Sequence, residues 1–89
     1  MQEVLIRGID FESTEEIHDY IAEELSFPSY YGKNLDALYD VLTDLSQETR
    51  IRIDLTDTEN EEIRDYLLRM EEVMEDAAAE NSWLTIETE

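Results

Sequence analysis

Three aspartates spaced by four residues, Asp36, Asp40 and Asp44, form the pattern that most clearly suggests a function. An α-helix turns 100° per residue, so the three lie within about 80° around its axis and about 6 Å apart along it. Each like-charge i,i+4 pair costs roughly 0.2–0.5 kcal/mol, and Asp44 also lies at the negative end of the helix dipole. On spacing alone, a solvated face of an acidic chain is the simpler interpretation, and a basic partner is the alternative.

Aromatic rings flank these aspartates. Tyr30 and Tyr31 precede the predicted helix, and Tyr39 falls at the border between its acidic and apolar faces. Rigid amphipathic rings beside charges are a common composition of protein-binding hot spots. The alternative is that one or two of these rings complete a small core. The pattern is therefore typical of a binding surface but does not exclude a structural role for some of the tyrosines.

The sequence offers no arrangement typical of a catalytic site. His18 is its single histidine, and we expect a helix-surface or boundary residue there rather than a general base. There is no cysteine and no serine nucleophile elbow, and Gly8 and Gly32 are too far apart to form a phosphate-binding loop. Residues 54–59 carry carboxylates without the alternation and turn glycine of an EF-hand. We expect no enzyme, no catalytic residue, no metal site and no cofactor.

Composition narrows the class of partner. The chain has 89 residues, with 25 Asp and Glu against 6 Lys and Arg, and a formal net charge of −19. Such a chain repels nucleic acid and anionic lipid and attracts basic proteins. It has no apolar run of about 18 residues and no basic region followed by an apolar stretch at its N-terminus. We expect a cytoplasmic monomer that binds neither a membrane nor nucleic acid directly.

Caps and periodicity predict the helices that would position these residues. Ser13 and Glu16 fit a capping box, and isoleucines follow at helical spacing. Pro28 marks a break, and Asn34 is a cap for a second helix whose leucines point inward. Apolar residues recur at helical spacing over 58–79, which predicts one long helix or a bent pair.

Three short apolar segments predict strands. Residues 3–7 are expected to form a buried strand, residues 50–55 alternate as a strand with one wetter face, and residues 83–86 close the chain as a third strand. Strands separated by helical crossovers favour parallel pairing. The predicted fold is an α/β domain of residues 1–89, with a three-stranded parallel sheet packed by three to four helices.

The segment from Tyr30 to Thr43, YYGKNLDALYDVLT, closely resembles the central motif of the barstar family of intracellular ribonuclease inhibitors. Residues 24–28 and 84–86 are more weakly similar to the flanking parts of that family. The resemblance implies a three-stranded parallel sheet and inhibition by an acidic helix that blocks the basic active site of a barnase-type ribonuclease, where it mimics RNA phosphates. It also implies that Asp40 enters the phosphate pocket of the enzyme.

The same resemblance implies the remaining partner-binding positions. Matching interface positions are Tyr30, Gly32, Asn34, Asp36 and Thr43. Asp76 and Glu80 match acids of the later helix. The sequence departs from the family pattern at five places: Tyr39 replaces a tryptophan, Lys33 replaces an acid, Asp44 and Leu45 replace a glycine and a tryptophan, and Asp76 replaces a glutamate that is one methylene longer. Tyr39 and Asp44 complete the set of expected binding residues.

The expected partner is therefore a basic ribonuclease. The residues leave two alternatives open. One is an immunity protein against a different toxin nuclease, and the other is an acidic interaction module that inhibits no nuclease.

Overall fold

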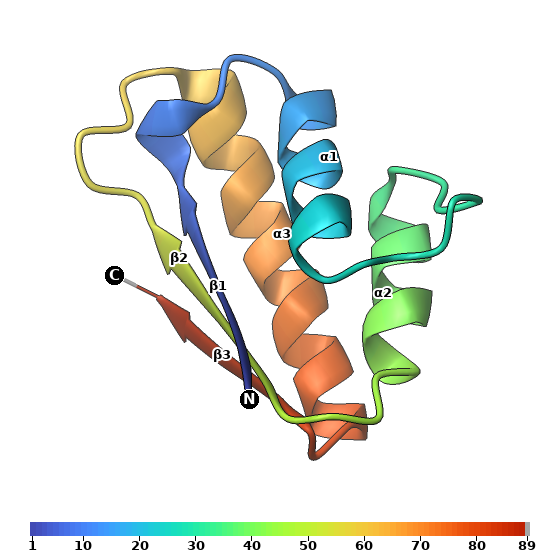
Figure 1. The fold of residues 1–89 in the computed structure, drawn as a ribbon. Helices are drawn as coiled ribbons and strands as arrows, with labels where there is room; N and C mark the ends of the chain where they lie inside the picture. The colour runs from blue at the N-terminus through green and yellow to red at the C-terminus, as the bar shows by residue number, and fades with distance from the viewer. Residues whose placement is uncertain (89) are drawn as a thin grey trace.

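The computed structural model describes residues 1–88 and places one sheet beside a layer of helices (Figure 1). The elements in chain order are β1 (Gln2–Arg7), the 3₁₀ turn η1 (Gly8–Asp10), α1 (Thr14–Glu24), α2 (Leu35–Thr43), β2 (Thr49–Asp54), α3 (Glu61–Glu80) and β3 (Leu84–Thr88). The predicted α/β class is confirmed. Three α-helices form within the described residues, the lower of the two numbers expected.

The three strands pair in the order β1-β2-β3, and both pairs are parallel. Ile51 of the central strand lies between Val4 of β1 and Ile86 of β3. Parallel neighbours require a crossover connection, which α1 and α2 supply between β1 and β2, and α3 supplies between β2 and β3. The predicted parallel sheet is confirmed.

The helices lie on one side of the sheet and leave its other side uncovered (Figure 1). Val4 and Ile6 are buried, but Glu3, Leu5 and Arg7 between and beside them are exposed. The predicted buried strand is therefore buried on one side only, because a parallel sheet covered on one side alternates like an antiparallel one. We call the uncovered side the bare sheet face.

Charged side chains cover much of the bare sheet face. The guanidinium of Arg50 lies 3.6 Å from a carboxylate oxygen of Glu3 and 3.5 Å from one of Glu87. Arg52 reaches the other oxygen of Glu87 at 3.5 Å. These pairs join all three strands, so Arg50 and Arg52 are directed to neighbouring strands rather than to the helices.

Side-chain caps fix where the helices begin. The Oγ of Ser13 accepts a hydrogen bond from the Glu16 amide at 3.2 Å, and Glu16 accepts one from the Ser13 amide at 3.0 Å. This confirms the predicted capping box. The Ala37 amide donates to Oδ1 of Asn34 at 2.8 Å, so Asn34 caps α2 as expected. α2 therefore has a defined first turn, which orients the aspartates that follow.

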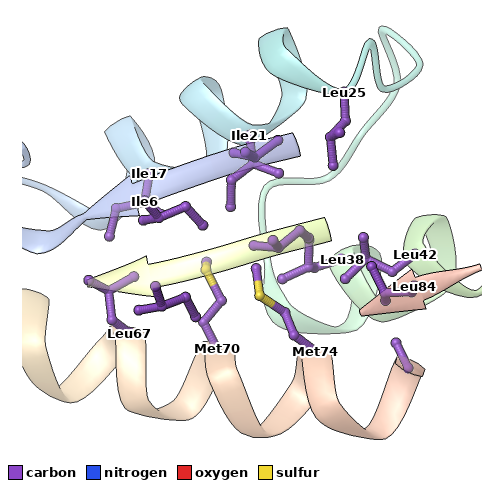
Figure 2. Packing of buried hydrophobic residues seen from close by; sticks show 14 of the residues in the cluster. Ile6, Ile17, Ile21, Leu25, Leu38, Leu42, Leu67, Met70, Met74 and Leu84 are labelled. Atoms are coloured by element: carbon purple, nitrogen blue, oxygen red, sulfur yellow. The ribbon is translucent and has the colours of Figure 1, made fainter. Parts of the chain in front are cut away.

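The segment expected as one helix or a bent pair forms a single helix, α3, of 20 residues. Leu67, Met70 and Met74 of α3 are fully buried, and they face Ile6, Ile17 and Leu38 of the opposite elements (Figure 2). α2 packs against α3. Within residues 1–88, no helix combines the length and apolar character needed to cross a membrane.

Candidate functional site

Two aspartates of α2 and the aspartate that follows its last residue lie on the outer side of the helix. Asp36, Asp40 and Asp44 are exposed, whereas Leu38 and Leu42 between them are fully buried in the core (Figure 2). The core therefore fixes the rotation of α2 and holds the carboxylates outward. The predicted separation of an acidic face from an apolar face is confirmed, and we call Asp36, Asp40 and Asp44 the acidic stripe.

Lys33, the cation closest in sequence to the acidic stripe, is directed elsewhere. Its Nζ lies 2.7 Å from Oδ1 of Asp19 and 3.7 Å from a carboxylate oxygen of Glu15, both on α1. The hydrogen bond to Asp19, with the charge of the same carboxylate, raises the pKa of Lys33 above its usual value. Lys33 has a φ of 53°, so the loop turns through a left-handed residue as it delivers this side chain to α1. Lys33 is therefore paired with α1 and not with the acidic stripe.

The C-terminal ends of α2 and α3 meet at one end of the molecule (Figure 1). The buried side chain of Asn81, which follows α3, connects them: its Nδ2 donates to the carbonyl oxygens of Leu42 at 2.9 Å and Leu45 at 3.0 Å. No local pattern predicts this role for Asn81, because its partners lie 36 to 39 positions away. The residue therefore joins the two helix ends in a way that only the fold reveals.

This meeting of helix ends concentrates negative potential. The C-terminus of an α-helix carries a partial negative charge that basic residues usually offset. The last turn of neither α2 nor α3, both fully described, contains Lys or Arg. Asp44 instead caps α2, and Asp76 and Glu80 are exposed on the C-terminal part of α3. This end of the molecule thus attracts cations.

The loop before α2 presents one tyrosine and buries the next. Tyr30 is 85% exposed, whereas Tyr31 is buried and its ring centroid lies 5.0 Å from that of Phe27 in an edge-on arrangement. Asn34 donates from Nδ2 to the carbonyl of Gly32 at 3.3 Å, which stiffens the connection to α2. Of the two tyrosines preceding the helix, Tyr30 is available to a partner and Tyr31 serves the core.

Tyr39 and Thr43 are half-buried on α2. The Thr43 hydroxyl donates to the carbonyl oxygens of Tyr39 and Asp40, each at 3.0 Å, so its proton is used within the helix. Its oxygen can still accept a hydrogen bond from a partner.

His18 is a buried residue that the sequence did not identify. It is 1% exposed, its Nδ1 lies 2.6 Å from the Tyr31 hydroxyl, and its Nε2 lies 2.6 Å from the Tyr66 hydroxyl. The prediction of a helix-surface or boundary histidine was wrong. The available signal was its position next to Ile17 and three residues before Ile21, which places it close to the apolar side of α1.

Burial lowers the pKa of His18 below its ordinary value, and Lys33 adds to the effect while Asp19 opposes it. The ring is therefore neutral at pH 7, with one nitrogen donating to a tyrosine and the other accepting from a tyrosine. This arrangement connects α1, the loop at Tyr31 and α3. His18 thus holds the loop that carries Tyr30 without itself reaching the surface.

Two hollows flank α2. One, of about 450 Å³, lies between α2 and α3 and is lined by Asn34, Leu35, Asp36, Tyr66, Arg69 and Val73. The other, of about 150 Å³, lies between the loop and the C-terminal half of α2, and Tyr30, Asp44 and Leu45 are among its lining residues. The acidic stripe therefore belongs to a ridge with a hollow on each side, a shape suited to entering a cleft of another protein.

The structure brings most of the expected binding residues to two neighbouring helices and one loop. Those that are exposed are Tyr30, Gly32, Asn34, Asp36, Asp40, Asp44, Asp76 and Glu80. Their part in binding remains a prediction. Among residues 1–88, no group of three or more His, Asp or Glu side chains is arranged to hold a metal ion.

The chain matches a described protein family and a bacterial relative. A model of the family described as "Barstar (barnase inhibitor)" matches residues 1–87. The chain is also similar to a Bacillus subtilis (strain 168) protein named "Putative ribonuclease inhibitor YrdF", with 54% identity over 43 residues. That match spans 48% of this chain and 47% of the relative, about half of each. Because the family model covers nearly the whole chain, the protein belongs to the barstar family.

Proposed function

We propose that this protein inhibits a ribonuclease by inserting the α2 ridge into the enzyme's active site. A ribonuclease must bind the phosphates of RNA and therefore carries cationic groups around its cleft. Three carboxylates about 6 Å apart along a helix can occupy such phosphate positions. Unlike RNA, the helix offers no phosphodiester bond to cleave, so the bound enzyme is blocked.

The observation that carries this proposal is the exposed acidic stripe, which runs along α2 and ends where the C-terminal ends of α2 and α3 are joined. The aspartates repel one another, and the helix dipole favours Asp36 in the first turn but opposes Asp44, so the charge of Asp44 adds no stability to the free protein. A basic partner removes both penalties. Opposite charges also speed the encounter, towards about 10⁸–10⁹ M⁻¹s⁻¹ at low salt.

Membership of the barstar family indicates an inhibitor protein rather than an enzyme. The name of the Bacillus relative supports the same class of activity. Within the proposed interface, Asp40 is the central residue, because it lies in the middle of the acidic stripe. Asp36, Tyr30, Tyr39 and Asp76 surround it as supporting contacts.

The partner contacts proposed for the remaining positions follow from their place around the ridge. Gly32 and Asn34 belong to the loop at the start of α2, Thr43 and Asp44 to its end, and Glu80 to the neighbouring end of α3. All these residues belong to one copy of the chain, so a monomer is sufficient to bind one enzyme. An inhibitor protects RNA in the compartment that it shares with the nuclease, which is why we place it in the cytoplasm.

The direct test is to titrate the protein against a barnase-type ribonuclease while RNA cleavage is followed. We expect stoichiometric inhibition that weakens as salt rises from about 0.05 to 0.5 M, because salt screens exposed charges. Full cleavage at micromolar inhibitor would reject barnase-type enzymes as targets. If a panel of other microbial ribonucleases also remains fully active, the inhibitory proposal is wrong.

A further inference from the structure

The smaller hollow beside α2 is built from two segments with different chemistry. Its apolar walls include Phe27 and Pro28 of the loop and Val41 and Leu45 of the helix end. Tyr30 and Asp44 also line it, and both are exposed. Its volume of about 150 Å³ matches that of cavities that accept a benzene-sized group. We call this hollow the Tyr30–Asp44 groove.

The groove is held open by the protein's own structure. The Phe27 amide donates to the Ala22 carbonyl at 2.9 Å, and the Tyr31 amide donates to the Pro28 carbonyl at 3.0 Å. Tyr31 is fixed in turn by its hydroxyl contact with His18. The loop wall is therefore tied to α1 at both ends, and a ligand would meet a preformed site rather than order a loose one.

The charge of the groove selects a cation. Asp44 is the C-cap of α2, so its carboxylate lies where the helix dipole is already negative. Anionic ligands are repelled there, and a neutral apolar ligand would leave the carboxylate of Asp44 without a binding partner. A cation with an apolar stem satisfies both the walls and the carboxylate.

Arginine fits this groove better than lysine. Its guanidinium is more weakly hydrated than an ammonium, stacks on aromatic faces and bonds a carboxylate through two donors. The exposed ring of Tyr30 and the carboxylate of Asp44 offer both kinds of contact on the rim of one groove. The ammonium of lysine would have to give up strong hydration for a mainly apolar wall.

We propose that the Tyr30–Asp44 groove is a receptor for an arginine side chain of the partner protein, with its methylenes on the apolar wall and its guanidinium between Tyr30 and Asp44. The proposal rests on the inhibitory function, because it assigns to the same interface a second anchor, which shares Asp44 with the acidic stripe. Asp44 and Leu45 then help to determine which partner is bound, because a ribonuclease with an arginine opposite the groove would be preferred.

The groove can be tested without any nuclease. N-acetyl-L-arginine amide is titrated into the ¹⁵N-labelled full chain and followed by NMR, with N-acetyl-L-lysine amide as the matched cation. We expect saturable shifts of the Tyr30, Asp44 and Leu45 amides with a dissociation constant on the order of millimolar, about −4 kcal/mol. Lysine should bind at least about threefold more weakly because it lacks stacking and bidentate pairing.

Two variants separate the groove from general charge attraction. Asp44→Asn removes the groove carboxylate and should weaken arginine binding about three- to fivefold, the range of an exposed ion pair. Asp65→Asn removes the same charge from an exposed position of α3 and should leave binding unchanged. Both sites are on the surface, so the variants are expected to fold, and their ¹⁵N spectra show whether they do.

The outcomes decide between the two proposals. If arginine and lysine shift the same amides equally, or if Asp65→Asn weakens binding as much as Asp44→Asn, the groove is not an arginine receptor. Such a result leaves ribonuclease inhibition untouched. If the arginine probe binds as expected but no ribonuclease is inhibited, the inhibitory function is wrong and the chemistry of the groove stands.

Discussion

Asn81 provides a sharp test of how the two helix ends are held together. Its side chain makes three short hydrogen bonds: Nδ2 donates to the carbonyls of Leu42 at 2.9 Å and Leu45 at 3.0 Å, and Oδ1 accepts from the Trp83 amide at 2.9 Å. Replacement by alanine removes all three. At about 1 kcal/mol each, the Asn81→Ala variant should lose about 3 kcal/mol of unfolding free energy.

That loss is large for a chain of this size, whose total stability is about 5–15 kcal/mol. It corresponds to a fall in melting temperature of about 12–24 °C. Urea unfolding monitored by circular dichroism measures this loss of free energy. An unchanged slope of the unfolding free energy against urea concentration shows that the native state remains compact. Ser82→Ala, one position further and exposed, is the control and should stay within about 0.5 kcal/mol of the parent.

An isosteric variant tests the electrostatic part of the reasoning. In Asn81→Asp a carboxylate faces the helix carbonyls, so this variant should be less stable than Asn81→Ala at pH 7. The folded state raises the pKa of that carboxyl, and the difference between the two variants should therefore shrink as pH falls towards about 4. If Asn81→Asp is as stable as the parent at pH 7, the C-terminal ends of α2 and α3 do not form a site of negative potential.

Three further predictions concern other parts of the molecule. Asp40→Ala should weaken binding to an inhibited ribonuclease by at least about 2 kcal/mol, measured by calorimetry at fixed salt. The control Asp65→Ala should have little effect on binding, and equal losses for the two variants would indicate diffuse charge attraction instead. Because the pKa of His18 is lowered in the folded state, its stabilising contribution is complete above pH 6.5 and is lost as pH falls through the folded value. The free energy of unfolding measured in urea should therefore be lower at pH 6 than at pH 8, and His18→Gln should abolish the part of that decrease which comes from His18. Gly8→Ala should destabilise the protein by about 1–3 kcal/mol, since an added Cβ would lie 2.4 Å from Oγ1 of Thr58, and a melting temperature equal to that of the parent would contradict this packing.

The parts of the fold predicted from sequence are those set by local chemistry. Ser13 and Asn34 cap helices because their side chains accept hydrogen bonds from amides three residues ahead. The buried positions of Leu38 and Leu42 follow from helical spacing, which also places the acidic stripe outward. The parallel sheet follows from strands that alternate with helices.

The errors arose where distant segments decide the outcome. β1 was expected to be a buried strand but is buried on one side only, because no local signal says that every helix packs on the same side of the sheet. His18 is buried because Tyr31 and Tyr66, 13 and 48 positions away, supply partners for both ring nitrogens. Similarly, the sequence places Lys33 beside the acidic helix, whereas the loop turns its side chain to α1.

The bare sheet face gives the protein a side suited to attachment. Thr85 of β3 is exposed there and lies in register with Arg50 of the central strand. The sequence contains no cysteine, so a Thr85→Cys substitution would create a unique thiol for a dye, a resin or a sensor chip. A molecule immobilised through that thiol would be tethered through its sheet, with the helical layer directed to solution.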